Sequence, residues 1–425
     1  MKNLAILGGK SLGPANFIFN GHGWPIYDEK EIQAVQDVVK SGMWGTGGPK
    51  QVEFEETFAE YCGAKYGVMM TNGTHTLKLA MEVLGIGPGD EVIVPGWTWQ
   101  ATASSVLDVN AVPILVDVDP NTFTIDPKKI EEAITPRTKA IIPVHLYGRV
   151  CDMDAIMALA EKHNLYVIED CAHQHGSEWR GKKVGTIGNI GSFSQQATKI
   201  LQTGEGGICL TNDEELYERL YSMKFCGRER VAGAGWPTMQ SGNFRSNEFA
   251  ATLGLCQLSR LTEQNEKRRE NAIYLEDMVQ QEIPGFTHLY RDERVTFQTY
   301  YRLSFRYNKE LWDGVSRAAV MKAVKAELDD TLKLPPSYEP LNQSPLYQPH
   351  SKRTHYLSEE YWKAIDPKRF DLPVIEKLWK EESINVDHCA LLAEKSDMDK
   401  IVDAMKKVYK NLDELKEYDA TLNQK

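Results

Sequence analysis

The sequence lacks the features that mark secreted, zinc-binding or membrane-spanning proteins. None of its seven cysteines forms a Cys-x-x-Cys motif, and their odd number and wide scatter argue against a disulfide framework or a metal site. Scattered thiols are typical of a reducing compartment, so we expect a cytoplasmic protein. Apolar runs of about 18 residues are absent, and the apolar run near the N-terminus is too short for a signal peptide, so no membrane association is expected.

The chain also lacks an excess of positive charge. Its 425 residues include 49 Lys and Arg against 60 Asp and Glu, which gives a formal net charge of −11. Nucleic acid is not an expected partner, because its phosphates would be repelled by the negative charge of the protein. The length allows two to three domains at about 150 residues each.

What the sequence does contain is a repeated alternation of short apolar runs and helical patterns. Several runs are apolar at consecutive positions, which is typical of strands buried on both faces. The expected strands are 66–71, 91–96, 112–119, 140–148, 165–171, 191–195 and 207–212, and the expected helices are 74–84, 99–106, 127–134, 152–163 and 213–224. This order predicts an α/β fold with a large, mostly parallel seven-stranded sheet, helices on both faces and ligands at the carboxyl ends of the strands.

The pattern changes after residue 254. A charged helical stretch at 257–281 is followed by an aromatic-rich strand pattern at 295–307 and by a Pro- and Tyr-rich stretch at 334–350. Further helices are expected near 314–329, 371–382 and 396–418. We therefore expect an N-terminal segment (1–45) that packs with a small C-terminal α+β domain (276–425), and a large α/β domain (46–275).

Two motifs at expected strand ends are suited to binding an anion and a flat ring. In TNGTHT (71–76) a strand ends and a helix begins, so free N–H groups and the helix dipole favour an anion, and Thr74 adds a hydroxyl. In PGWTWQAT (95–102), Trp97 and Trp99 reach a strand end, where an aromatic ring can stack on a heteroaromatic ligand. Taken alone, the first motif is more often a capped turn and the second more often core packing.

An acidic strand end and a lysine complete the pattern. YVIEDCAHQHG (166–176) delivers Glu169 and Asp170 to the sheet edge, where a buried carboxylate needs a cation or a hydrogen-bond donor. SFSQQATKILQTGEGG (192–207) places Ser194 and Lys199 around a turn. A lysine that forms a Schiff base needs a pKa lowered by burial or by nearby cations. Together, the anion site, ring platform, carboxylate and lysine predict pyridoxal 5'-phosphate (PLP) as the cofactor.

These motifs, with NGTHTL, VIVPGWTW, IIPVHLYG and SGNFRSNEFAATLG, resemble the fold-type I sugar aminotransferases of the DegT/DnrJ/EryC1/StrS family from about residue 24 to 407. The resemblance implies a PLP-dependent aminotransferase in which Lys199 forms the internal aldimine and then acts as general base in a ping-pong cycle. Family members with His at the lysine position dehydrate sugars, and Lys199 argues against that branch. The positions matching the family's cofactor site are Gly73, Thr74 and Ser194 for the phosphate, Trp99 for the ring, Asp170 for the pyridine nitrogen, and His173 near the phenolic oxygen.

The resemblance also implies a homodimer with shared active sites. In the family, an Asn in a GxNxR-like turn reaches the phosphate of the neighbouring subunit. Here the turn reads SGNFRS, which gives Asn243 that role and makes the adjacent Arg245 a candidate substrate contact. The turn departs from the family pattern because Ser241-Gly242 stands where Gly-Tyr is common.

Within the family, several segments resemble the glutamine:scyllo-inosose and 2-deoxy-scyllo-inosose aminotransferases. They are PVHLYG, the double Gln of FSQQATK, QTYYR (298–302), PLYQPH (345–350) and INVDHCALLAEKSDMDKI (384–401). This implies L-glutamine or L-glutamate as amino donor and a keto-cyclitol or keto-sugar as acceptor. It also makes His388 a substrate contact, with a hydrogen-bonded loop histidine as an equal alternative. A 3-amino-5-hydroxybenzoate synthase-like enzyme and a nucleotide-ketosugar aminotransferase stay open.

Two interpretations from other functional classes have less support. A dinucleotide-binding oxidoreductase needs G-x-G-x-x-G after a strand, whereas GTIGNIG (185–191) has another spacing and precedes a strand. A regulatory protein that binds the cofactor but catalyses no reaction would not need to retain Lys199.

Overall fold

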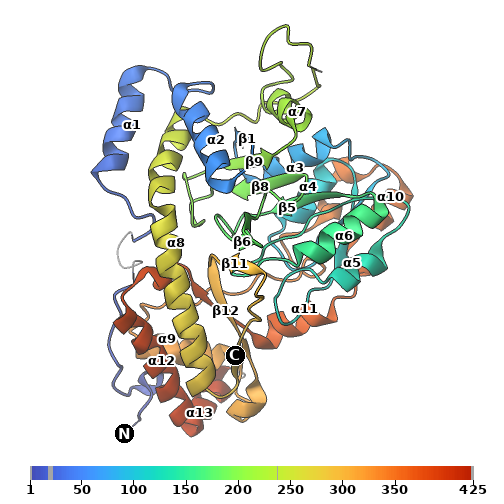
Figure 1. Cartoon of the computed structure of the whole chain (residues 1–425). Coiled ribbons are helices and arrows are strands. Elements are labelled where there is room, and N and C mark those ends of the chain that lie inside the picture. The colour runs from blue at the N-terminus through green and yellow to red at the C-terminus, as the bar shows by residue number, and fades with distance from the viewer. Residues whose placement is uncertain (1, 18–22, 237, 423–425) are drawn as a thin grey trace.

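The structure, a computed structural model, describes residues 2–17, 23–236 and 238–422. Its largest element is a seven-stranded sheet with the order β1-β9-β8-β5-β4-β2-β3 (Figure 1). The strands are β1 (Tyr66–Met70), β2 (Glu91–Pro95), β3 (Val112–Val116), β4 (Thr138–Ile141), β5 (Tyr166–Asp170), β8 (Ile190–Ser194) and β9 (Gly207–Thr211). Only β9 is antiparallel to its neighbours in this sheet. The predicted α/β fold with a mostly parallel seven-stranded sheet is confirmed.

Helices cover both faces of this sheet. Because side chains alternate along a strand, Val92 and Val94 point into one apolar core and Ile93 into the other. The first core is closed by α3 (Gly73–Val83), α4 (Ala101–Asp108) and α7 (Glu214–Lys224), and the second by α2 (Pro49–Cys62), α5 (Pro127–Ala133), α6 (Met153–His163) and part of α8 (Glu248–Glu282). The sheet is therefore buried on both faces, as its consecutive apolar residues predict.

Two expected strands differ from the observed ones. The 140–148 pattern gives only β4, which ends at Ile141, because Pro143 has no N–H to continue the ladder. The 295–307 pattern gives two strands in different sheets, β11 (Val295–Phe297) and β12 (Arg302–Tyr307). The aromatic-rich pattern identified strand character here but not the irregular segment at residues 298–301 that separates the two strands.

The long helix α8 connects the large sheet to a second core. Figure 1 shows it running along the whole side of the molecule, with α1 (Glu29–Ser41) beside one half and α9 (Arg317–Glu327) and α12 (Lys395–Lys410) near the other. Leu261 of α8 packs in a core of the large sheet, whereas Leu275 and Val279 pack in the second core. That second core covers an antiparallel sheet of β10 (Phe286–His288), β12 and β13 (Ser383–Asp387).

The N-terminal residues pack on two different elements. Leu4 and Phe17 belong to the second core, and the Ala5 amide donates to Glu327 Oε1 at 2.8 Å. Helix α1 packs instead on α8, where Glu31 pairs with Arg260 at 2.7 Å. The domain bounds at 45 and 275 stay predictions, because α8 continues through residue 275 without a break.

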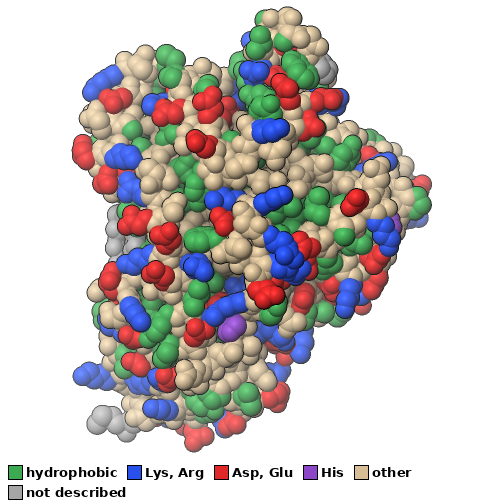
Figure 2. Space-filling view, viewed as in Figure 1, with side chains coloured by type: hydrophobic (Ala, Val, Ile, Leu, Met, Phe, Trp, Pro, Cys, Tyr) green, Lys and Arg blue, Asp and Glu red, His purple; other side chains and the backbone are tan. Residues whose placement is uncertain are grey.

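The remaining elements surround these cores. They are β6 (Glu178–Trp179), β7 (Lys182–Lys183), α10 (Glu359–Ala364), α11 (Pro373–Lys377) and α13 (Leu412–Leu422). Basic and acidic side chains are interspersed over the face shown in Figure 2. Within the described ranges, each helix is too short or too polar to cross a membrane.

Candidate active site

Seven of the ten predicted site residues line a single cavity of about 420 Å³ at the carboxyl ends of the parallel strands. They are Gly73, Thr74, Trp99, Asp170, His173, Ser194 and Lys199. The parallel strands carry these segments to one edge of the sheet, as expected for this topology. Tyr301, Arg302 and Tyr338 enter the same cavity from beyond the large sheet.

One end of the cavity is formed by the N-terminus of α3. Asn72 caps the helix by accepting a hydrogen bond from the His75 amide at 2.9 Å. The amides of Gly73 and Thr74, the first two residues of the helix, have no preceding helical carbonyl to bind. A Cβ on Gly73 would lie 2.7 Å from Ser194 Cβ, so glycine allows α3 to approach the end of β8 this closely. Two free amides and two hydroxyls therefore converge as an anion cradle.

Asp170 is buried in the cavity wall at the end of β5. Its Oδ2 accepts from Thr102 Oγ1 at 3.0 Å and its Oδ1 from the Ala172 amide at 3.2 Å. Burial raises the pKa of this carboxyl above its ordinary value. A carboxylate offers about four acceptor positions, so the two donors leave capacity for a cationic N–H in the cavity.

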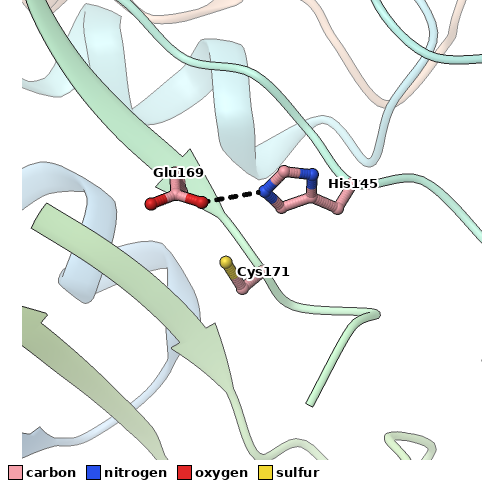
Figure 3. Close-up of side chains that lie close together, drawn as sticks. All are labelled: His145, Glu169 and Cys171. Atoms are coloured by element: carbon pink, nitrogen blue, oxygen red, sulfur yellow. Dashed lines mark hydrogen bonds and ion pairs between the residues drawn. The ribbon is translucent and has the colours of Figure 1, made fainter. Parts of the chain in front are cut away.

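The adjacent acid, Glu169, faces the opposite side of the sheet and belongs to a structural cluster. Figure 3 shows His145 Nε2 next to Glu169 Oε2, at 3.2 Å, with Cys171 close by. Because His145 Nδ1 accepts from a backbone amide, its Nε2 carries the proton. Glu169 also accepts from the amides of residues 185, 187 and 188 at 2.7 to 2.8 Å. These donors occupy the acceptor positions of both carboxylate oxygens, so Glu169 has few lone pairs left to bind a metal ion.

Lys199 is buried beside Asp170 and lies over an aromatic ring. The turn that carries it is closed by the Lys199 amide, which donates to the Gln196 carbonyl at 2.8 Å. Its Nζ lies 4.7 Å from the centroid of Tyr301. Burial lowers the pKa of Lys199, so its amine loses a proton more readily than a surface lysine does. This is the property that the sequence analysis required of a Schiff-base lysine.

His173 is fixed in one tautomer by its neighbours. The Tyr147 amide donates to Nδ1 at 3.2 Å, so the proton resides on Nε2, which lies 3.3 Å from the Tyr338 hydroxyl. The ring stacks on Tyr301 with centroids 4.1 Å apart. Burial holds the pKa of His173 well below its ordinary value, so this imidazole stays neutral.

Four cavity residues were missed by sequence reasoning. Thr102, Tyr301, Arg302 and Tyr338 had no assigned role, although QTYYR and the Pro- and Tyr-rich stretch were noted as family-like segments. A hydroxyl three residues after Trp99 was the available signal for Thr102. The others come from beyond the large sheet, and no spacing rule places them next to Lys199.

The other three predicted residues lie outside the cavity lining. Asn243 is exposed and accepts from Arg245 Nε at 2.8 Å, on the segment that projects between α7 and α8 in Figure 1. His388 is 2% exposed, and its Nε2 donates to the Thr198 carbonyl at 3.1 Å behind the lysine turn. This contact matches the alternative of a hydrogen-bonded histidine. The roles assigned to all three by resemblance stay predictions.

Comparison with known proteins agrees with this geometry. Residues 25–389 match the DegT/DnrJ/EryC1/StrS aminotransferase family. The L-glutamine:2-deoxy-scyllo-inosose aminotransferase of Streptoalloteichus tenebrarius is 40% identical over 411 residues, covering 92% of this chain and 96% of the relative.

Two solved structures superpose on this chain over most of their length. The synthase of 3-amino-5-hydroxybenzoic acid has a TM-score of 0.78 at 30% identity, covering 93% of this chain and 98% of the other. S. venezuelae DesV in complex with a ketimine intermediate has a TM-score of 0.74 at 28% identity, covering 90% of this chain and 94% of the other. The chain therefore belongs to the DegT/DnrJ/EryC1/StrS family and is an aminotransferase.

Proposed function

We propose that this aminotransferase uses PLP to move an amino group from L-glutamine or L-glutamate to a keto-cyclitol or keto-sugar. The observation that carries the proposal is the convergence of Lys199, Asp170 and the α3 N-terminus in one cavity. Bound there, PLP would supply an electrophilic carbonyl and an electron-withdrawing ring.

The residues present fit the cofactor. The free amides at the start of α3, with the hydroxyls of Thr74 and Ser194, suit a phosphate. Asp170 keeps acceptor capacity for a protonated pyridine nitrogen, and Trp99 lies on the rim with 46% of its surface exposed, which suits ring stacking. The neutral His173 has one N–H, on Nε2, which would have to turn from the Tyr338 hydroxyl to donate toward a phenolic oxygen of the cofactor.

The chain's own residues divide the work of proton transfer. Lys199, with its lowered pKa, can accept a proton from the substrate carbon and return it to a neighbouring atom. Asp170 stays ionised when a cation lies against it, and Thr102 and the Ala172 amide hold its two oxygens in place. Tyr301 packs under the Lys199 amine and restricts its position.

The choice of acceptor rests on the relatives and on the charge of the cavity. The 40% identical S. tenebrarius relative is named for a cyclitol ketone and for L-glutamine as donor. Among the described lining residues, Lys199 and Arg302 are the cationic side chains, which suits a neutral polyol better than a sugar diphosphate. A 3-amino-5-hydroxybenzoate synthase-like reaction would instead give an aromatic product, which ultraviolet absorbance would detect.

A homodimer would complete the site. Asn243 is exposed, and among the described residues its side chain hydrogen-bonds to Arg245 alone, which suits its proposed role at the phosphate of a neighbouring subunit. Exposed apolar side chains gather around α1 and α2, which offers a contact surface. They are Ile32, Val39, Met43, Trp44 and Val52, each 43 to 53% exposed. A cytoplasmic location, argued from the free cysteines, is part of the same proposal.

The test is Lys199→Ala. We expect this variant to purify folded, to show no visible absorbance from a lysine-bound cofactor and to have no transaminase activity. Lys182→Ala, at an exposed lysine of the same domain, is the matched control. It should keep the absorbance of the lysine-bound cofactor and the transaminase activity. Donor specificity follows from bleaching of the cofactor band by L-glutamine or L-glutamate, and acceptor specificity from a panel of keto-cyclitols and keto-sugars. An active Lys199→Ala enzyme would refute the assignment.

A further inference from the structure

Arg302 is a partly buried cation in the cavity lining, and no ion pair ties it to a carboxylate of the described residues. It begins β12, and its Nη1 donates to the Pro336 carbonyl at 2.8 Å. Three aromatic rings surround the guanidinium, with Cζ 4.9 Å from the centroid of Tyr147, 5.1 Å from Tyr338 and 5.6 Å from Tyr301. Among the described residues, no carboxylate lies within ion-pair distance of it. The Asp387 side chain, on the paired position of β13, attracts the guanidinium from beyond ion-pair distance and accepts a hydrogen bond from the Cys389 amide.

A guanidinium in this setting is prepared for an anion. It has five N–H donors in a planar fork that matches a carboxylate, and the protein accepts a hydrogen bond from Nη1. The three tyrosine rings flank the guanidinium at cation–π distances, so it has less side-chain freedom to lose on binding than a surface arginine has. A partly buried guanidinium that no carboxylate contacts directly leaves N–H donors available, and a negatively charged ligand would be its most favourable partner.

The position of Arg302 selects which anion. The cofactor phosphate has its own cradle at α3 and Ser194, whereas Arg302 lies with the tyrosines next to Lys199, which packs on the same Tyr301 ring. An amino acid donor must bring its α-carbon to Lys199, and its carboxylate is bonded to that carbon. A cation adjacent to the lysine is therefore where the carboxylate must bind. A polyol acceptor carries no such charge.

We propose that Arg302 binds the α-carboxylate of the amino donor, with Tyr147, Tyr301 and Tyr338 as the cage that holds it. This inference rests on the proposed function and adds to it the residue that recognises the donor. When the polyol acceptor occupies the same place, the Arg302 N–H donors and the hydroxyls of Tyr301 and Tyr338, which line the cavity, are available to its hydroxyl groups. One site thus serves both halves of the reaction without a conformational switch.

The experiment compares a donor with the same molecule lacking its carboxylate. The holoenzyme is mixed with L-glutamine or 4-aminobutanamide, or with L-glutamate or 4-aminobutanoate, and bleaching of the cofactor band is followed. We expect the native enzyme to prefer the amino acid by about 10- to 100-fold in second-order rate, as for a hydrogen bond to a charged group. In Arg302→Gln the two rates should be equal within about twofold, through slower reaction of the amino acid only. Arg302→Lys, which keeps the charge but not the fork, should retain part of the preference.

Controls separate this role from a structural one. Arg317→Gln removes another largely buried arginine, whose Nη1 donates to the Ser383 carbonyl, and should leave the preference unchanged. The proposal is overturned if Arg302→Gln keeps the native preference or slows both amines equally. It is also overturned if Arg245→Gln, rather than Arg302→Gln, abolishes the preference. A native enzyme that reacts with neither amino acid would instead contradict the proposed function.

Discussion

Replacing Asp170 by Asn separates the catalytic value of this carboxylate from its effect on folding. Asn has the same shape and keeps an oxygen to accept from the Ala172 amide or from Thr102, so the local structure should persist. What disappears is a full negative charge in a site where Asp170 is only 5% exposed. Activity should therefore fall while the fold stays intact.

The magnitude follows from Coulomb's law. Two unit charges about 3 Å apart interact by about 5.5 kcal/mol at an effective dielectric constant of about 20. An amide oxygen retains part of this through its dipole, and about 1.4 kcal/mol corresponds to a factor of ten. We therefore expect turnover of the amino donor to fall by about 10²- to 10⁴-fold in Asp170→Asn, measured as bleaching of the cofactor band.

The stability of the cofactor-free variant should change in the opposite sense. Burial raises the pKa of Asp170 in the folded protein, so the folded state binds this proton more tightly than the unfolded chain does. The resulting stabilisation is complete at pH values below the unfolded pKa and is lost as pH rises through the folded pKa. At neutral pH the ionised group opposes folding, so the cofactor-free Asn variant should be at least as stable as the native protein in urea.

Two results would contradict this reasoning. If Asp170→Asn kept more than about a tenth of native turnover, the carboxylate would not act on a cation in the cavity. If the cofactor-free variant were clearly less stable than the native protein, Asp170 would be serving the fold rather than the cofactor. Asp213→Asn, at the cap of α7 outside the cavity, is the matched control and should keep native turnover.

Three further changes test other parts of the site. Thr102→Val removes the hydroxyl that donates to Asp170 and should lower turnover about tenfold, with the melting temperature measured in parallel. Gly73→Ala places a Cβ 2.7 Å from Ser194 Cβ and should weaken cofactor binding at least about tenfold, seen by equilibrium dialysis, because the anion cradle must open. Glu169→Gln turns an acceptor oxygen into an amide donor facing backbone N–H groups and should lower the free energy of unfolding by about 2 to 4 kcal/mol in urea. An unchanged free energy of unfolding in Glu169→Gln would contradict the structural role of that cluster.

The convergence of the residues proposed to hold the cofactor was predictable because it depends on local chain order. Thr74, Asp170 and Ser194 each follow or end a strand of one parallel sheet, and topology alone brings such ends together. The strand pattern could not show that Glu169 and Asp170 serve opposite faces. Only the register of β5 in the sheet decides which of two adjacent acids points into the cavity.

The substrate half was not predictable because it depends on packing between segments far apart in the chain. Arg302 begins a strand of the small sheet, and Tyr338 comes from a stretch without regular secondary structure. The turn before Arg302 also divides what the sequence presented as one strand. The aromatic pattern of residues 295–307 indicates that these side chains are buried. It does not indicate which of the rings lies under Lys199.

Tyr147 explains how these separate segments are held together. It is fully buried and has φ of +55°, a left-handed conformation that is unfavourable for a residue with a side chain. The strain is offset by hydrogen bonds, because its amide donates to His173, its carbonyl accepts from the Tyr301 amide and its hydroxyl accepts from the Tyr338 amide. One strained residue after β4 thus binds His173 and both outer tyrosines. Strain retained at this point is consistent with a functional constraint, since a relaxed backbone would release the aromatic wall around Arg302 from the sheet that positions Lys199.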